Sequence, residues 1–333
     1  MKEVRKLVNE YRSDVLDLVH FGHLVIVNEA SNVIFKVGDP DVITFYRSSS
    51  KPVQALPVIE RCLDKLYGFT DEETVLFGGS HCGDDIHVSC ARSMIEKSAV
   101  LEDMFVMKPA VPHRTSSNEA RIRLNLPPGK LYQNCVGKHI ASVLLQRSFG
   151  EKEENYWKPD SPAQREIMKT ICIIDESDMS KMKIGIDGCG VPVFAVGLRH
   201  IATAFKNLAA PEKIKDDALQ KAVISYVPRI HKYPHMMRGE GYLCTILNKD
   251  PNIIAKGGAN GVYGFSLKKE KLGIAFKIAD GSQGVWPFIV REVLHSLHAL
   301  SAETDEHLAA LDLNEIKNDS GCVVGYREIA FKI

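Results

Sequence analysis

The sequence predicts an α+β protein in which one antiparallel sheet, built from both ends of the chain, packs on helices beside a helical subdomain. Short β-branched runs bounded by turn residues gather near the two ends of the sequence, whereas helical spacing fills most of the middle. Strands distributed in this way pair most economically in a single sheet. We therefore expect residues 1–333 to form one unit, with 1–52 and 250–333 forming the sheet with flanking helices and 53–249 mainly helical.

The first half of the chain opens with strands and continues with helices. The predicted strands are 23–27, 33–37 and 42–46, the last ending at three serines. The predicted helices are 53–66, 71–78, 85–98, 137–149 and 163–175, with N-caps at Asp84 or Asp85 and at Ser161. Residues 108–134 carry four prolines and no periodic pattern, which indicates a long functional loop.

The second half returns to strand character at its end. A strand at 182–186 precedes helices at 196–207, 212–231 and 239–247. A hairpin of 261–267 and 272–279, helices at 284–299 and 303–311, and a last strand at 322–332 complete the chain. No internal repeat interrupts this order, so the prediction contains no repeat architecture.

Composition excludes several classes of partner. The 42 basic and 42 acidic residues balance, which argues against a nucleic-acid or membrane-surface partner. No apolar run reaches the roughly 18 residues of a membrane helix, and the charged start Met1–Lys6 does not resemble a signal peptide. The eight cysteines are dispersed without a C-x-x-C pair, so we expect reduced thiols and a cytoplasmic location.

The stretch at 47–52, where a β-branched run stops at three serines, is the first candidate for chemistry. Ser48 and Lys51 are three residues apart and share a face once a helix has begun. A serine needs a neighbouring base to become a nucleophile, and a desolvated lysine can serve as that base. The alternative interpretation is a serine-rich helix start followed by a solvated lysine.

A second serine, Ser80, lies in the glycine-flanked loop G-G-S-H-C-G at 78–83, just before a predicted helix. The glycines allow close approach to a ligand, and the helix start offers backbone N–H donors. An ordinary turn between helices explains the same pattern. His81 and His87 could be ligands or bases, although structural histidines are the simpler interpretation, and Cys82 could be a nucleophile.

Two cysteines on defined turns, Cys135 and Cys189, indicate either a zinc site or two buried free thiols. Two thiolates are too few for zinc, so His139, Asp187 or a lysine would have to complete the shell. Further along, Lys256 precedes two glycines. Its positive charge could bind a substrate carboxylate or assist a second serine. Lys277 competes for that role.

The order of these motifs resembles a known family, the rhizobial-type class 3 L-asparaginases. The matching stretches, spread over about residues 20–290, are R-S-S-S-K-P-V-Q-A-L-P (47–57), G-S-H-C-G (79–83), N-C-V-G-K-H (134–139), D-G-C-G-V-P (187–192) and K-G-G-A-N-G-V (256–262). That family is similar in fold to class A β-lactamases, penicillin-binding proteins and serine glutaminases, which also build one sheet from both chain ends.

The resemblance implies hydrolysis of the side-chain amide of L-asparagine by a homodimer. It implies two serine–lysine pairs, matched by Ser48 with Lys51 and by Ser80 with Lys256, with either serine as the nucleophile. It also implies a zinc ion, held by residues that match Cys135, Lys138 and Cys189. The substrate-binding positions that we carry over are Arg47, His81, Asn134, His139 and Asp187.

Three positions depart from the family pattern: Cys82 and Val136 stand where serine is common, and Asn260 stands where glutamate is usual. The departures leave other functions open. The site could act on glutamine, β-lactams or D-peptides, bind asparagine without catalysis, or use Cys82 as a thiol nucleophile.

Overall fold

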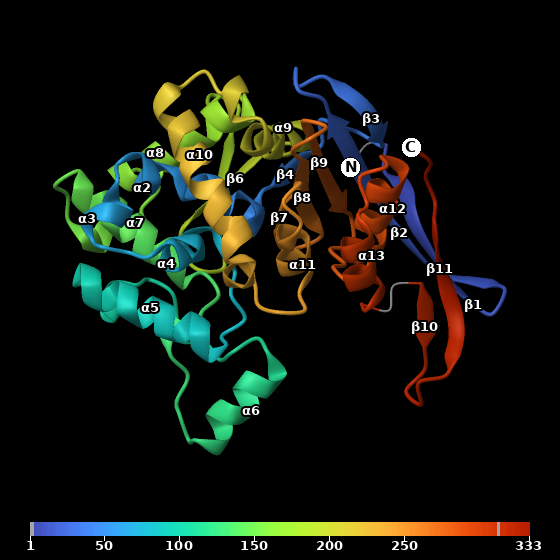
Figure 1. Cartoon of the computed structure of the whole chain (residues 1–333), viewed down its shortest axis with the longest axis horizontal. Helices are drawn as coiled ribbons and strands as arrows, with labels where there is room; N and C mark the ends of the chain where they lie inside the picture. The colour runs from blue at the N-terminus through green and yellow to red at the C-terminus, as the bar shows by residue number, and fades with distance from the viewer. Residues whose placement is uncertain (1–2, 312–313) are drawn as a thin grey trace.

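The computed structural model describes residues 3–311 and 314–333 and contains one large antiparallel sheet (Figure 1). Its strands follow the order β10-β11-β1-β2-β9-β8-β7, and β3 pairs with β2 beside this path. Their bounds are β1 Arg5–Arg12, β2 Val15–Val27, β3 Val33–Val37, β7 Ile253–Gly257, β8 Val262–Leu267, β9 Leu272–Ile278, β10 Glu315–Lys317 and β11 Val323–Ile329. Val8 of β1 lies opposite Ile329 of β11, and Gly22 of β2 lies opposite Ile278 of β9. The predicted sheet built from both chain ends is therefore confirmed.

Several strands were not predicted. β1 carries charged residues at four of its eight positions, and the first part of β2 is exposed, so neither shows the apolar alternation of a half-buried strand. β7 is buried throughout and follows a helix directly. A second, smaller sheet has the order β4-β6-β5, with bounds Ile43–Phe45, Pro192–Gly197 and Lys183–Ile186. The predicted helix at 196–207 overlaps β6 and begins later, as α9 (Leu198–Ala209).

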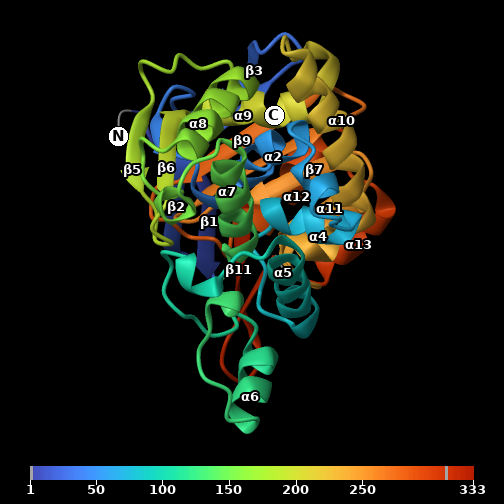
Figure 2. The ribbon, with the colours of Figure 1, turned by 90° about the vertical axis from the view of Figure 1, so that its left-hand side faces the viewer.

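The middle of the chain is mainly helical, as predicted. Its helices are α1 Lys51–Gln54, α2 Leu56–Glu60, α3 Leu63–Leu66, α4 Asp71–Val75, α5 Asp85–Ser98, α6 Thr115–Arg123, α7 Val136–Ser148, α8 Pro162–Asp175, α10 Asp217–Lys232 and α11 Leu243–Lys249. The predicted single helix at 53–66 is wrong, because Pro57 and the left-handed backbone of Cys62 divide it. Residues 108–134 are not wholly irregular, since α6 forms there and projects from the body of the molecule (Figure 2).

Local sequence accounts for the start of α8 but not for that of α5. The hydroxyl of Ser161 accepts a hydrogen bond from the backbone N–H of Gln164, so Ser161 caps α8 as predicted. Asp84 precedes α5, but its carboxylate makes no capping bond and instead accepts hydrogen bonds from Arg114 and Ser117. The end of the chain adds α12 Trp286–Ser296 and α13 Ala302–Ala309.

One cluster of buried apolar side chains joins the sheet to the helices. α9 packs against β2, β8 and β9, and the cluster includes Val25 and Phe276 from the sheet and Val58 and Leu144 from the helical part. This shared core holds the short 3-10 helix η1 (Arg47–Ser50), which connects β4 to α1, against β7 and β8, where the candidate site lies. Within the described residues, no helix has the length and apolar character needed to cross a membrane.

Candidate active site

The three serines after β4 lie on the short 3-10 helix η1 (Arg47–Ser50), which begins with a residue in an unusual conformation. Arg47 has φ of 51°, in the left-handed region that non-glycine residues seldom adopt and that is found most often at functional sites. Ser49 donates to the carbonyl of Tyr46 (2.7 Å) and Ser50 donates to that of Arg47 (3.0 Å). Ser48 makes no such bond to any described residue, and its half-buried side chain faces a cavity. Of the three hydroxyls, that of Ser48 is therefore the one available to a substrate.

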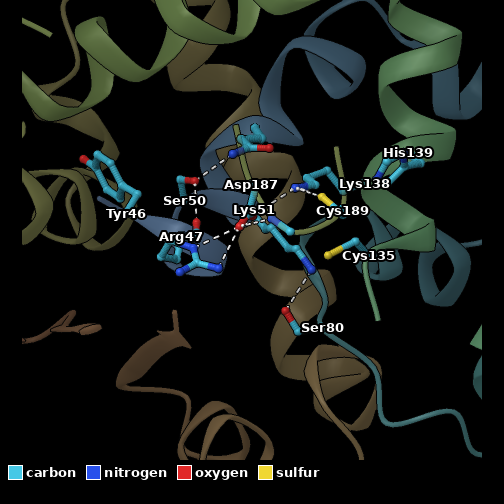
Figure 3. Close-up of polar contacts among 12 residues, drawn as sticks. Tyr46, Arg47, Ser50, Lys51, Ser80, Cys135, Lys138, His139, Asp187 and Cys189 are labelled. Carbon is cyan, nitrogen blue, oxygen red and sulfur yellow. Dashed lines mark hydrogen bonds and ion pairs between the residues drawn. The ribbon is translucent and has the colours of Figure 1, made fainter. Parts of the chain in front are cut away.

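Lys51 is fully buried and lies between both serine loops. Its ammonium donates to the Ser80 hydroxyl (2.9 Å), the Gly79 carbonyl (2.9 Å) and the Asn134 carbonyl (3.1 Å) (Figure 3). Burial lowers its pKa, which brings the free amine closer to the neutral pH range. Lys51 follows Ser48 by one turn, and its backbone N–H bonds to the Ser48 carbonyl. The Lys51 ammonium is therefore bonded to Ser80, whereas among the described residues no hydrogen bond joins it to the hydroxyl of Ser48.

The predicted partner of Ser80, Lys256, makes no hydrogen bond to it among the described residues. Lys256 of β7 is 1% exposed and donates to the carbonyl of Gly257 (2.7 Å), whereas Lys51 is the lysine that bonds to Ser80. Burial lowers the pKa of Lys256 to about 7. Ser80 and Lys256 still line the same cavity. Lys277, the competitor, donates to the carbonyl of Asn260 and does not line that cavity.

A cluster of thiols and charges lies on the far side of Lys51 from Ser80 (Figure 3). Lys138 Nζ lies 3.1 Å from Cys189 Sγ and 3.8 Å from Asp187, and Arg47 pairs with Asp187 at 2.9 Å. A hydrogen bond from Cys135 and the charge of Lys138 together lower the pKa of Cys189 to about 5, against the effect of burial. The pKa of Cys135 rises to about 12, because it donates that hydrogen bond and is buried.

The three predicted zinc ligands therefore converge. Two sulfurs and one amine nitrogen, from Cys135, Cys189 and Lys138, are buried, with Lys138 Nζ 3.1 Å from Cys189 Sγ and the thiol of Cys135 interacting with that of Cys189. Sulfur and nitrogen are donors that zinc accepts, although the lysine would have to bind as the neutral amine. The residues present therefore fit a zinc ion, with Asp187 beside the cluster.

The cavity in front of Ser48 and Ser80 has a volume of about 660 Å³. Four predicted site residues line it: Ser48, Ser80, Asn134 and Lys256. The sequence prediction missed other lining residues, including His113, Arg238, Tyr242, Gln283 and Trp286. Their segments carry no motif, and only the glycines at 239 and 241 beside Arg238 offered a signal.

Two histidines predicted to bind substrate lie outside the cavity lining. His139 bonds to the hydroxyl of Tyr156 (2.6 Å), and burial lowers its pKa to about 3. His81 accepts from the backbone N–H of Gly83 and stacks on His87, and burial lowers its pKa well below the usual value. Both rings are buried, which for His81 agrees with the structural interpretation offered by the sequence. Arg47 and Asp187 pair beside Ser48 and do not line the cavity either.

Cys82 lies apart from the cavity as well. Its thiol is buried and donates to Asp84 (3.1 Å), and burial together with that carboxylate raises its pKa. Cys82, Asp84 and His87 have ligand atoms within 4.8 Å of one another, but Arg114 already pairs with the carboxylate. These surroundings disfavour a thiolate nucleophile at Cys82.

Comparison with known proteins identifies one family. A family model described as L-asparaginase II matches residues 8–329, and no curated protein matches the chain. A β-lactamase from Mycobacterium bovis has a TM-score of 0.43 at 13% identity, covering 84% of this chain and 95% of its own. A putative β-lactamase from Bacteroides dorei scores 0.42 at 12% identity, covering 82% and 93%. A hydrolase with promiscuous acyltransferase activity scores 0.39 at 10% identity, covering 87% and 93%.

These structural similarities are too low to carry a functional argument, whereas the family model spans nearly the whole chain and agrees with the order of the sequence motifs. The chain therefore belongs to the L-asparaginase II family.

Proposed function

We propose that the chain hydrolyses the side-chain amide of L-asparagine to L-aspartate and ammonia through a serine acyl-enzyme. The observation that carries this proposal is the buried Lys51, which is bonded to Ser80 and follows Ser48 by one helical turn, behind two serines that line a cavity. A serine with an adjacent lysine of lowered pKa is a recognised arrangement for nucleophilic catalysis. Family membership supports asparagine as the substrate.

In the first half-reaction, Ser48 Oγ attacks the amide carbon while Lys51 takes the hydroxyl proton. The backbone N–H of Ser48 is a candidate donor to the developing oxyanion, since N–H groups in a first helical turn lack carbonyl partners. The carbon–nitrogen bond then breaks. The leaving nitrogen takes up the proton from Lys51, passed through the Ser80 hydroxyl that Lys51 contacts.

In the second half-reaction, water attacks the acyl ester. Lys51 accepts a proton from that water and returns it to Ser48, which releases aspartate and restores the free enzyme. Lys256 lines the same cavity, and burial lowers its pKa to about 7. Its amine can therefore gain or lose a proton there near neutral pH. A zinc ion held by Cys135, Lys138 and Cys189 would supply a fixed positive charge beside Asp187. That charge would help to orient the substrate.

Ammonia release tests the reaction directly. We expect the purified protein to release ammonia from L-asparagine, and to release it at least about tenfold more slowly from L-glutamine because one methylene displaces the amide carbon. Equal rates of ammonia release from the two amides would indicate an amidohydrolase that does not distinguish asparagine from glutamine. No release from either amide, with nitrocefin hydrolysed instead, would favour a β-lactam hydrolase.

Elemental analysis tests the metal. We expect zinc at about one ion per chain in the normal protein and its loss in Cys189→Ala and in Cys135→Ala, because each variant removes a sulfur ligand. Cys172→Ala is the matched control, since that half-buried thiol of α8 lies outside the cluster. Full retention of zinc in Cys135→Ala would remove that residue from the ligand set.

Two further expectations rest on composition and resemblance. We propose a homodimer, which sedimentation equilibrium would reveal, and a cytoplasmic location, which fractionation of the source cells would test.

A further inference from the structure

The charge of the cavity is the first observation beyond the proposed reaction. Arg238 lines the cavity, donates from Nη1 to the Ser80 carbonyl (2.9 Å) and stacks on the ring of Tyr242 at 5.0 Å. No described carboxylate pairs with it. Among the described residues that line the cavity, none is an aspartate or a glutamate. The cavity therefore offers a cation for a substrate carboxylate and no anion for a substrate ammonium.

The size of the cavity is the second observation. L-Asparagine has nine non-hydrogen atoms, and at roughly 30 Å³ for each, the volume of a water molecule in the liquid, it fills about 270 Å³. The cavity measures about 660 Å³ and falls within the range of pockets that hold larger ligands. Free asparagine thus leaves more than half of the space unused.

The lining of the remaining space is the third observation. Beside the serines and the cations, the cavity is lined by apolar and aromatic side chains: Tyr242, Leu243, Tyr263, Trp286, Pro287 and Leu311. Tyr263 and Trp286 pack edge to face at 5.1 Å, which fixes this wall. A wall of this kind binds an apolar or aromatic group by removing it from water.

We propose that the preferred substrate is an L-asparagine whose α-amino nitrogen carries an apolar acyl group; this inference rests on the proposed function. Acylation removes the ammonium that has no partner and keeps the α-carboxylate that Arg238 binds. The acyl group lies against the apolar wall while the side-chain amide reaches Ser48. Water cleaves only the side-chain carbon–nitrogen bond, so the products are the N-acyl-L-aspartate and ammonia.

The test compares ammonia release from L-asparagine, N-acetyl-L-asparagine and N-benzyloxycarbonyl-L-asparagine. We expect kcat/KM to rise in that order, by about tenfold or more overall, because the largest acyl group buries the most apolar surface. A higher kcat/KM for L-asparagine than for both acylated compounds overturns this inference and leaves the proposed function standing. No ammonia from any of the three overturns both.

A substitution that fills part of the cavity tests whether the acyl group binds inside it. Gly284 lines the cavity and a Cβ there meets no atom within 4 Å, so the backbone leaves room for the larger side chain of Gly284→Phe to begin at the cavity lining. We expect the ratio of kcat/KM for the benzyloxycarbonyl compound to that for L-asparagine to fall about tenfold in Gly284→Phe. Gly284→Ala is the matched control and should keep the ratio. An unchanged ratio in Gly284→Phe contradicts the placement of the acyl group.

Arg238→Gln tests the carboxylate contact. We expect KM for N-benzyloxycarbonyl-L-asparagine to rise about tenfold or more, because a charged hydrogen bond is lost. The same substitution should change KM much less for the derivative whose α-carboxyl is an amide, since that compound has no anion to lose. Equal losses for both compounds would show that Arg238 only supports Ser80, which overturns its assignment to the carboxylate.

Discussion

Ser48→Ala is expected to lower kcat for L-asparagine by about 10⁴-fold or more, because no acyl-enzyme can form without the attacking oxygen. The substitution should leave the fold intact, since the Ser48 hydroxyl bonds to no described residue. We therefore expect a thermal midpoint close to that of the normal protein. Steady-state ammonia release and differential scanning calorimetry on the same preparation would measure both quantities.

Neighbouring serines provide the controls for that experiment. Ser49→Ala is the matched variant, because its hydroxyl is buried against the Tyr46 carbonyl and away from the cavity. It should keep most of the activity. Ser80→Ala should slow acylation, and with it the release of ammonia, without abolishing either, because it removes the proton relay from Lys51 but keeps the attacking serine. If Ser48→Ala keeps more than about a tenth of normal kcat while Ser80→Ala is inactive, Ser80 is the nucleophile.

Lys256→Met is expected to abolish most activity and to stabilise the protein at pH 7. Burial holds the pKa of this lysine at about 7, against the ordinary value of 10.5, so folding disfavours its charged form. Methionine has a similar length and needs no solvation. We expect a gain of about 1–3 kcal/mol in the free energy of unfolding, in line with replacements of buried charges by apolar residues.

The gain should depend on pH in a defined direction. Between pH 7 and 10.5 the unfolded chain binds the Lys256 proton and the folded chain does not, so the stability of the normal protein rises with pH. The advantage of Lys256→Met should therefore shrink from pH 7 toward pH 10. Urea unfolding at both pH values measures it, with Lys269→Met, at an exposed position, as the control. An advantage that grows with pH would contradict the lowered pKa.

Sequence predicted the parts of the site that depend on local motifs. Ser48 and Lys51 lie on one short helical segment, so their spacing alone brings them near each other. Cys135 and Lys138 flank the start of α7 in the same way, and the turn at Cys189 brings the second sulfur to them. The first two pairs are close in sequence, and the turn at Cys189 is marked by the glycines on both sides of it. Local sequence therefore indicates all three.

Other features depend on contacts between distant segments, which no local pattern encodes. Arg238 reaches the cavity from the segment between α10 and α11, and Trp286 reaches it from the start of α12. Lys51 bonds to Ser80, which lies 29 positions further along the chain. His139 illustrates the opposite error. It adjoins Lys138 in the motif, but successive residues of a helix point about 100° apart, and its ring turns to Tyr156 instead of the cavity.

The pairing of β1 with β11 has a consequence for how the chain folds. Residues 8–12 find their partners at 325–329, so this part of the sheet cannot close until residue 329 has been synthesised. Contacts this distant in sequence slow folding, because the entropy of loop closure is lost before the contacts form. During translation, two strand edges would be unpaired: the edge of β1 that faces away from β2, and the edge of β2 that later pairs with β9. A nascent chain with such open edges is vulnerable to aggregation, and we expect its yield to depend on growth temperature and on chaperone supply.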